Sequence, residues 1–253
     1  MANEHAGHRE RVREKVEKVG VDALSDIDML EIALFNCMTR GDTRGIATAL
    51  VKKFGSFSAS VNAPVTELLK IKGLGGKSVD FLKTIPDLSR FYLDGINKSK
   101  KRIFDINSSY EYLKYKFLGL TKECVAVVIL DGRSKVVFND ILWQGTVSQV
   151  PVYVRDLVAL CIHYDADTVI IAHNHPSGNP APSKGDLSAT KELQIALESV
   201  SVSLGDHLII TDTDYTSMRK SGWLGDLITA SDQYRKSILI AAKKVEDELD
   251  FDD

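Results

Sequence analysis

One short run constrains this chain more than any other, because an apolar stretch leads directly into two histidines. The stretch ADTVIIA predicts a buried strand, and His173 and His175 follow it two residues apart. Side chains two apart on a strand point to the same side, so both imidazoles can face one point while Asn174 faces the other way. The next segment, PSGNPAPS, is rich in turn-forming residues and brings the chain round to a predicted helix that carries Asp186.

Two imidazoles and one carboxylate form a donor set that suits zinc. With His173, His175 and Asp186 as ligands, the fourth position of a tetrahedral ion stays open for water, which is the arrangement of catalytic sites. Ser183 stands three residues before Asp186, so the run is also typical of a capped helix start. The two interpretations are compatible, since a rigid helix start positions a ligand well. The sequence therefore predicts one catalytic zinc ion.

Composition places the chain among ordinary globular proteins. With 253 residues, 44% apolar and 26% charged, it is long enough for one large domain or two small ones. Apolar runs such as CVAVVIL are too short to span a bilayer, and the charged N-terminal stretch lacks the apolar core of a signal peptide. Cys37, Cys124 and Cys161 form no CxxC pair. We expect a cytoplasmic protein with no disulfides and no membrane partner.

The chain changes character along its length, which predicts two domains. Residues 1–97 predict helices throughout, for example over DIDMLEIALFNCM, RGIATALVKKFG and PVTELLKIKG. Residues 98–103 are basic and predict a linker. Within 104–226 the strand-like runs ECVAVVIL, KVVFNDILW, DTVIIAH and DHLIIT alternate with helices, which predicts an α/β domain with a mixed sheet covered by helices. Residues 227–253 predict a last helix and an acidic tail.

A second motif lies in the helical part, where the turn GLGG at residues 73–76 joins two predicted apolar helices. Glycine permits a tight turn that exposes backbone N–H groups at a helix start, and such a start can bind phosphate. Lys72 and Lys77 flank the turn, and residues 1–103 carry a net charge of +5. The motif resembles a helix-hairpin-helix. We expect either weak, sequence-independent DNA contact through Lys72 and Lys77 or a scaffold role.

The spacing His-x-His, seven residues, Ser, two residues, Asp resembles the JAMM, or MPN+, signature of zinc metallopeptidases. The wider run HNHPSGNPAPSKGD is similar to the RadC family, together with VVILDGRSK and QGTVSQV before it and DHLII and YTSMRKSGW after it. The segments GHRERVREK, DMLEIALF and LLKIKGLGGKS resemble the helical domain that precedes the MPN domain in RadC proteins. The resemblance covers nearly all of the chain except the acidic tail. It implies an N-terminal all-α domain followed by an MPN (JAMM) domain.

The resemblance also implies roles for single residues. A glutamate at the start of an early strand activates the zinc water in JAMM enzymes, and Glu123 stands in that place, with Asp140 as its rival. Ser183 corresponds to the hydroxyl that stabilises the oxyanion, although a helix cap alone also accounts for it. His207 matches the RadC pattern, and such a histidine is more often a hydrogen-bonded core residue or a residue that supports a ligand than a ligand itself. The run around Arg155 departs from the family's Pro-Arg-Glu, so the role of Arg155 stays open.

Together these features predict a zinc-dependent hydrolase that cleaves an amide or isopeptide bond of a protein or peptide. Glu123 would deprotonate the water, and Ser183 would donate to the oxyanion. Two other interpretations stay open, a DNA-repair-associated protein that binds nucleic acid and a metal-dependent nuclease. One zinc with one base favours carbonyl attack, because phosphodiester cleavage more often uses two metals. The sequence makes no prediction of the oligomeric state.

Overall fold

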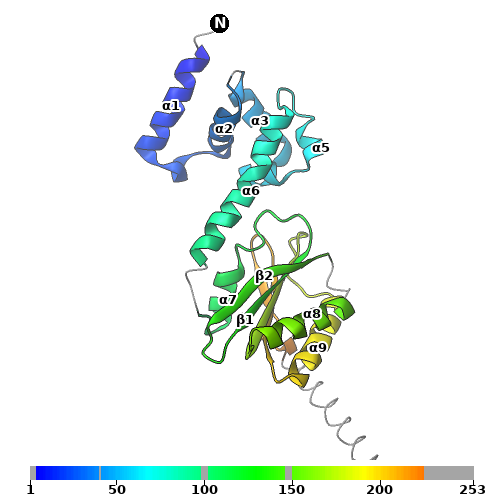
Figure 1. Cartoon of the computed structure of the whole chain (residues 1–253). Helices are drawn as coiled ribbons and strands as arrows, with labels where there is room; N and C mark the ends of the chain where they lie inside the picture. Colours follow the sequence, from blue (N-terminus) through cyan, green and yellow to red (C-terminus); the bar gives the residue numbers. More distant parts are fainter. Residues whose placement is uncertain (1–3, 40, 98–101, 146–149, 225–253) are drawn as a thin grey trace, which may run out of the picture. The chain divides into compact units, whose positions relative to one another are not determined.

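The structure is a computed structural model that describes residues 4–39, 41–97, 102–145 and 150–224. By its internal contacts the chain divides into two units, Met1–Phe91 and Tyr92–Asp253, which are described separately (Figure 1). The predicted domain boundaries stay predictions.

The first unit is helical, as the sequence predicts. Polar caps begin several of its helices, because a side-chain oxygen can accept one of the unpaired N–H groups of the first turn. Ser25 begins α2 with a capping box, and Asp42 caps α3. The helices are α1 (Glu4–Val19), the short 3-10 helix η1 (Val21–Ala23), α2 (Asp26–Cys37), α3 (Thr43–Phe54), α4 (Phe57–Asn62), α5 (Val65–Leu68) and α6 (Gly76–Asn97), of which residues 92–97 belong to the second unit.

The predicted helix hairpin differs from the structure in its first helix. The run PVTELLKIKG predicts a helix that reaches the glycine turn, but α5 ends at Leu68 after four residues. Ile71 and Leu74 are both buried, so the chain leaves the helix in order to bring these two side chains into the core. Gly73 has a φ of 89°, a left-handed conformation that favours glycine. The turn is therefore present, but a short turn of helix precedes it instead of a long one.

The second unit contains a five-stranded mixed sheet with the order β2-β1-β3-β4-β5, which confirms the predicted fold class. β1 is antiparallel to β2 and β3, β3 is parallel to β4, and β4 is antiparallel to β5. The short strand β5 is not apparent in the sequence pattern. The elements are α7 (Ile106–Leu113), β1 (Cys124–Leu130), β2 (Val136–Gln144), α8 (Val150–His163), β3 (Thr168–Asn174), α9 (Lys184–Ser199), β4 (Ser203–Ile210) and β5 (Tyr215–Ser217).

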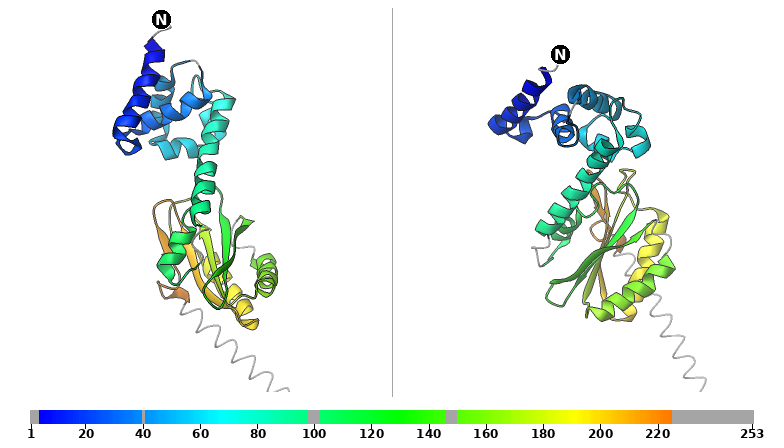
Figure 2. Two further views of the ribbon diagram at one scale, coloured as in Figure 1. Left: turned by 60° about the vertical axis from the view of Figure 1, so that its left-hand side comes forward. Right: turned by 45° about the horizontal axis from the view of Figure 1, so that its top comes forward.

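Helices cover both faces of this sheet (Figures 1 and 2). Leu157 of α8 and Leu193 of α9 pack with Val127 and Ile171 on one face. Leu113 of α7 packs with the residues of the other face. Burial on both faces explains why β1 and β3 are continuous apolar runs rather than alternating ones.

Part of the predicted organisation falls on residues that the structure does not describe. The last helix and acidic tail (227–253) lie outside the described residues, as do residues 98–101 of the predicted linker. The described end of that linker lies against the turn between β1 and β2, where the Ile103 N–H donates to the Ser134 carbonyl oxygen at 3.0 Å. Among the helices that are described, none combines the length and the apolar character that a membrane crossing requires.

Candidate metal centre

The predicted ligands lie at one edge of the sheet, where β3 ends and α9 begins. β3 and β4 are parallel neighbours, and α9 is the crossover between them. The connection therefore returns from the end of β3, and the first turn of α9 lies beside that end. His173 belongs to β3, His175 follows it directly, and Asp186 lies in the first turn of α9.

Three donor groups converge at this edge. His173 Nε2 lies 3.0 Å from His175 Nε2. The Asp186 carboxylate lies 3.3 Å from His173 Nε2 and 3.6 Å from His175 Nε2. Ligand atoms about 2.0 Å from a tetrahedral ion are about 3.3 Å apart, so these separations fit one small metal ion. Among the residues that the structure describes, no second group of three such side chains is found.

Hydrogen bonds decide which nitrogen of each histidine faces the centre. His175 Nδ1 lies 2.8 Å from the Asn179 carbonyl oxygen, which only accepts, so Nδ1 carries the proton. His173 Nδ1 lies 2.8 Å from Nε2 of His207. Both rings thus present Nε2 to the centre and use Nδ1 for support, as metal-binding histidines do.

Burial keeps His173 and His207 neutral. His173 and His207 are fully buried, and 13% of the His175 side chain is exposed. Burial lowers the pKa of His173 well below its usual value, with His207 as a further cause, and burial lowers the pKa of His207 to about 3. Within the described ranges, no lysine or arginine lies within 4.0 Å of the Asp186 carboxylate. A neutral His173 beside a carboxylate that no lysine or arginine neutralises suits metal binding, because a metal ion binds the neutral form of histidine.

Ser183 begins α9 and forms a capping box with Asp186, which confirms the predicted helix cap. Ser183 Oγ accepts the Asp186 N–H at 3.1 Å, and Asp186 Oδ2 accepts the Ser183 N–H at 2.7 Å. The second bond fixes the carboxylate so that Oδ1 lies on the His173 side. Because Ser183 Oγ acts as an acceptor in the cap, its hydroxyl hydrogen can be donated to another group.

Glu123 directly precedes β1, the strand beside β3. The register pairs Val125 with His173, and two more residues in the same register place Glu123 opposite His175. Residues two apart share a face, so Glu123 belongs to the face that carries Val125 and His173. The structure therefore brings the backbone of Glu123 to the same edge as the three donor groups.

Asp140, the rival of Glu123, lies elsewhere. It belongs to β2, pairs with Val127 and has an exposed side chain. The residue of β2 that pairs with Val125, and is thus level with His173, is Trp143. The register therefore favours Glu123 over Asp140 as the carboxylate near the centre.

Asn174, which the alternation predicts to face away from the two histidines, anchors the segment before β1. Its Oδ1 accepts the Cys124 N–H at 2.7 Å, and its Nδ2 donates to the Lys122 carbonyl oxygen at 3.0 Å. The two bonds bracket Glu123, and Asn174 itself is buried. β3 thus fixes the backbone of Glu123 as well as the two histidines. An asparagine between two histidines gives no sequence signal for this role.

Two polar side chains behind His173 complete the surroundings of the centre. His207, on β4, contacts His173, and its other ring nitrogen lies 2.6 Å from the Thr190 hydroxyl. The sequence leaves the role of His207 open and gives no role to Thr190. The sequence does contain a signal for Thr190, because this residue follows Asp186 by four positions and thus lies on the same face of α9. Arg155 is exposed on α8.

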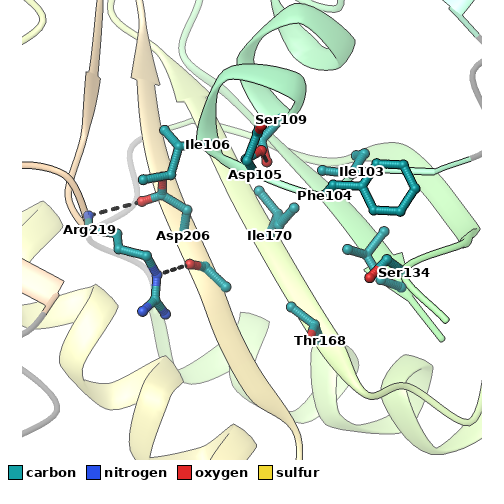
Figure 3. Close-up of a pocket in the computed structure, with 12 residues that line it drawn as sticks. Ile103, Phe104, Asp105, Ile106, Ser109, Ser134, Thr168, Ile170, Asp206 and Arg219 are labelled. Carbon is teal, nitrogen blue, oxygen red and sulfur yellow. Dashed lines mark hydrogen bonds between the residues drawn. The ribbon is translucent and has the colours of Figure 1, made fainter. Parts of the chain in front are cut away.

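A separate pocket of about 240 Å³ lies where β3 and β4 begin, and none of the predicted site residues lines it (Figure 3). Its polar groups bond to one another. The Arg219 N–H donates to the Asp206 carboxylate at 3.1 Å, and the Arg219 guanidinium donates to the Gly205 carbonyl oxygen. Asp206 also accepts the Ser217 hydroxyl at 2.5 Å. These contacts tie β4 to the segment that follows β5.

Comparison with known families gives two matches. The family described as RadC-like JAB domain matches residues 103–223, and the family described as UPF0758 N-terminal matches residues 4–79. The first match contains the three donor groups together with Glu123 and Ser183. The second contains the glycine turn at residues 73–76.

Proposed function

Because the chain belongs to the RadC family, we propose that it is a zinc-dependent hydrolase that cleaves an amide or isopeptide bond in a protein or peptide. The JAB domain supports a metal-dependent hydrolase or a role related to DNA repair. The observation that carries the narrower proposal is the convergence of two Nε2 atoms and one carboxylate within 4.8 Å of one another. Both imidazoles are already oriented by hydrogen bonds on their other nitrogen.

The donor set supports zinc over other common metals. Magnesium and calcium prefer oxygen ligands, whereas two imidazole nitrogens with one carboxylate suit zinc. His173, His175 and Asp186 leave one position of a tetrahedral ion for water or substrate. When bound, zinc supplies Lewis acidity to a carbonyl group and lowers the pKa of water to about 7.

The side chains of this chain then move the protons. Hydrolysis requires a water oxygen to attack the carbonyl carbon while Glu123 takes one proton from that water. Ser183 donates its hydroxyl hydrogen to the oxygen that becomes negative. Glu123 hands its proton to the leaving nitrogen as the carbon–nitrogen bond breaks, which yields one carboxylate and one amine.

The reaction can be tested with a randomised peptide mixture and a lysine-linked isopeptide in water enriched in ¹⁸O. Hydrolysis should place one ¹⁸O in each new carboxylate, which mass spectrometry detects. Glu123→Gln should lower the rate by about 10²–10⁴-fold and keep zinc, since a positioned base typically contributes that much. Glu192→Gln, an exposed glutamate of α9, is the matched control. Full activity of Glu123→Gln would reject Glu123 as the base, and loss of zinc would make it a ligand.

A second candidate function, sequence-independent DNA contact, is supported by one observation on the first unit. Lys72, Gly75, Gly76 and Lys77 are all exposed, and a Cβ added to either glycine would meet open space. Backbone N–H groups at the start of α6 are therefore accessible to a phosphate. A nuclease has less support, because the described residues contain one group of metal donors rather than two.

A further inference from the structure

A line of buried hydrogen bonds runs from His173 into α9. His173 Nδ1 lies 2.8 Å from His207 Nε2, and His207 Nδ1 lies 2.6 Å from the Thr190 hydroxyl. That hydroxyl lies 2.5 Å from the Asp186 carbonyl oxygen. His173, His207 and Thr190 have no exposed surface, so bulk water does not compete for these bonds. The line begins at one predicted metal ligand and ends at the backbone of another.

The direction of donation along this line is fixed at its Thr190 end. A carbonyl oxygen only accepts, so the Thr190 hydroxyl donates to Asp186 and accepts from His207 Nδ1. A neutral imidazole has one N–H, so His207 Nε2 is an acceptor and His173 Nδ1 donates to it. The Met218 sulfur, 3.4 Å from the hydroxyl, is another acceptor and leaves this direction unchanged.

The direction of these hydrogen bonds decides which nitrogen of His173 is free to bind a metal ion. With its proton on Nδ1, His173 has a free lone pair on Nε2, the nitrogen that lies 3.0 Å from His175 Nε2. The opposite direction would put the proton on Nε2 of His173, where it would exclude a metal ion. The line therefore selects the tautomer of His173 that is able to bind metal.

We infer that Thr190 and His207 are positioning residues that set the tautomer and ring orientation of His173 for the metal. The inference rests on the proposed function for the identity of the metal. It assigns a role to two residues outside the His-x-His-x7-Ser-x2-Asp spacing.

The surroundings of His207 support this role, because its backbone is fixed as well. Asp206 Oδ1 accepts the His207 N–H at 2.7 Å and the Arg219 N–H at 3.1 Å. Asp206 and His207 are neighbours on β4 and point to opposite faces of the sheet. The bond from the Arg219 N–H to Asp206, drawn in Figure 3, therefore helps to hold the strand segment from which His207 reaches His173.

The test measures zinc affinity of the full chain by competition with a chromophoric chelator, and the visible spectrum of the Co²⁺-substituted protein. Thr190→Val and His207→Phe should each weaken zinc binding by about 10–100-fold, the usual effect of losing a group that supports a ligand. Thr190→Ser keeps the hydroxyl and should bind zinc like the wild type. Thr211→Val is the matched control, because it removes another buried threonine hydroxyl, one that donates to Asp214.

The double variant Thr190→Val/His207→Phe sharpens the test. One break already interrupts the line, so the double variant should bind zinc about as well as the weaker single variant. A purely structural role would lower the melting temperature of the metal-free protein and would not change the Co²⁺ spectrum of the folded protein. If His207→Phe does not fold, the pair Thr190→Val and Thr190→Ser decides.

Two negative results would contradict different claims, one about Thr190 and His207 and the other about the zinc site. Wild-type zinc affinity in Thr190→Val, or fully additive losses in the double variant, would overturn the inference and leave the zinc site intact. A wild-type protein that binds no zinc would overturn the proposed function and the inference together.

Discussion

Two polar clusters with buried carboxylates, one in each unit, differ in whether their charges are balanced. In the first unit the Asp28 cluster joins two carboxylates to two cations. Asp28 contacts Lys15 at 2.9 Å and Arg44 at 2.6 Å, and Arg44 also contacts Glu31 at 3.2 Å. In the second unit, the three donor groups of the metal centre have no lysine or arginine within 4.0 Å of their carboxylate, among the described residues.

The difference separates a cluster whose charges stabilise the fold from a cluster that could hold a metal ion. Charges that compensate one another within the protein need no further partner. The metal centre combines a carboxylate with two lone pairs, and only an added cation satisfies all three. Buried carboxylates alone do not identify a functional site, because both clusters contain them. The charge balance is what distinguishes them.

The largest expected effect, and the one that tests this comparison first, is in the metal centre. A single substitution there should remove zinc and leave the fold intact. Asp186→Asn removes the only charge of the donor set, so stoichiometric zinc should be lost. An asparagine oxygen can still accept the Ser183 N–H, so the metal-free variant should unfold within about 1 kcal/mol of the wild type. Zinc analysis and urea unfolding check both statements. Retained zinc would show that the carboxylate is not a ligand.

In the first unit we expect the opposite result. Arg44→Met should lower the free energy of unfolding and leave the zinc content unchanged. Glu31 is fully buried, and Arg44 is about half exposed, so the cost should fall below the usual 3–5 kcal/mol for a broken buried pair, at about 1–3 kcal/mol. Urea unfolding of the full chain measures it. A neutral or stabilising effect would contradict the view of this cluster as a stabilising one.

The Asp28 cluster should also make the stability of the protein depend on pH under acidic conditions. Burial raises the pKa of Asp28, but hydrogen bonds from Lys15, Arg44 and Ser25 outweigh it and hold the pKa well below its usual value. A depressed pKa contributes stability that is present above about pH 4 and is lost as the pH falls below it. Asp28→Asn should therefore flatten the decline of stability below pH 4. An unchanged acid profile would reject this contribution.

A smaller effect is expected from Asn174→Ala, which frees the segment before β1. Zinc should stay bound because no donor group is lost. Peptide hydrolysis should fall by about 10–100-fold, since Glu123 would no longer be held in place. Rates and zinc content are measured on the same preparation. Equal activity in the variant would show that the backbone of Glu123 is positioned by other contacts.

The smallest effect concerns DNA. Lys72→Glu/Lys77→Glu should weaken sequence-independent binding and lower the salt slope of the affinity by about 2, if each lysine contacts one phosphate. Fluorescence anisotropy of the full chain at two salt concentrations measures it. Lys18→Glu/Lys52→Glu changes the charge equally elsewhere in the first unit and should have a weaker effect. Equal effects of both pairs would show that the net charge of the first unit, and not a contact at the glycine turn, attracts the DNA.

The sequence predicts elements and ligands where one local pattern decides them. The apolar runs of β1 and β3, the His-x-His spacing and the cap at Ser183 are all local, and the structure contains the two strands and the capped helix. The early end of α5 was not predictable, because it depends on how Ile71 and Leu74 reach a core built by other helices.

The supporting residues of the site depend on contacts between distant segments. Asn174 acts on residues some fifty positions earlier, and His207 meets His173 only because β4 lies beside β3. Neither contact leaves a spacing pattern in the sequence. The contacts of such residues become visible only when the register of the sheet is known.

The central claim is that His173, His175 and Asp186 hold one zinc ion. Metal analysis of the full chain, purified without chelator, tests it most directly when wild type, His173→Ala and His163→Ala are compared. His163 is an exposed histidine at the end of α8 and lies outside the centre. We expect about one zinc per chain in the wild type and in His163→Ala, and almost none in His173→Ala. A wild type without zinc, or equal zinc in all three proteins, would contradict the claim.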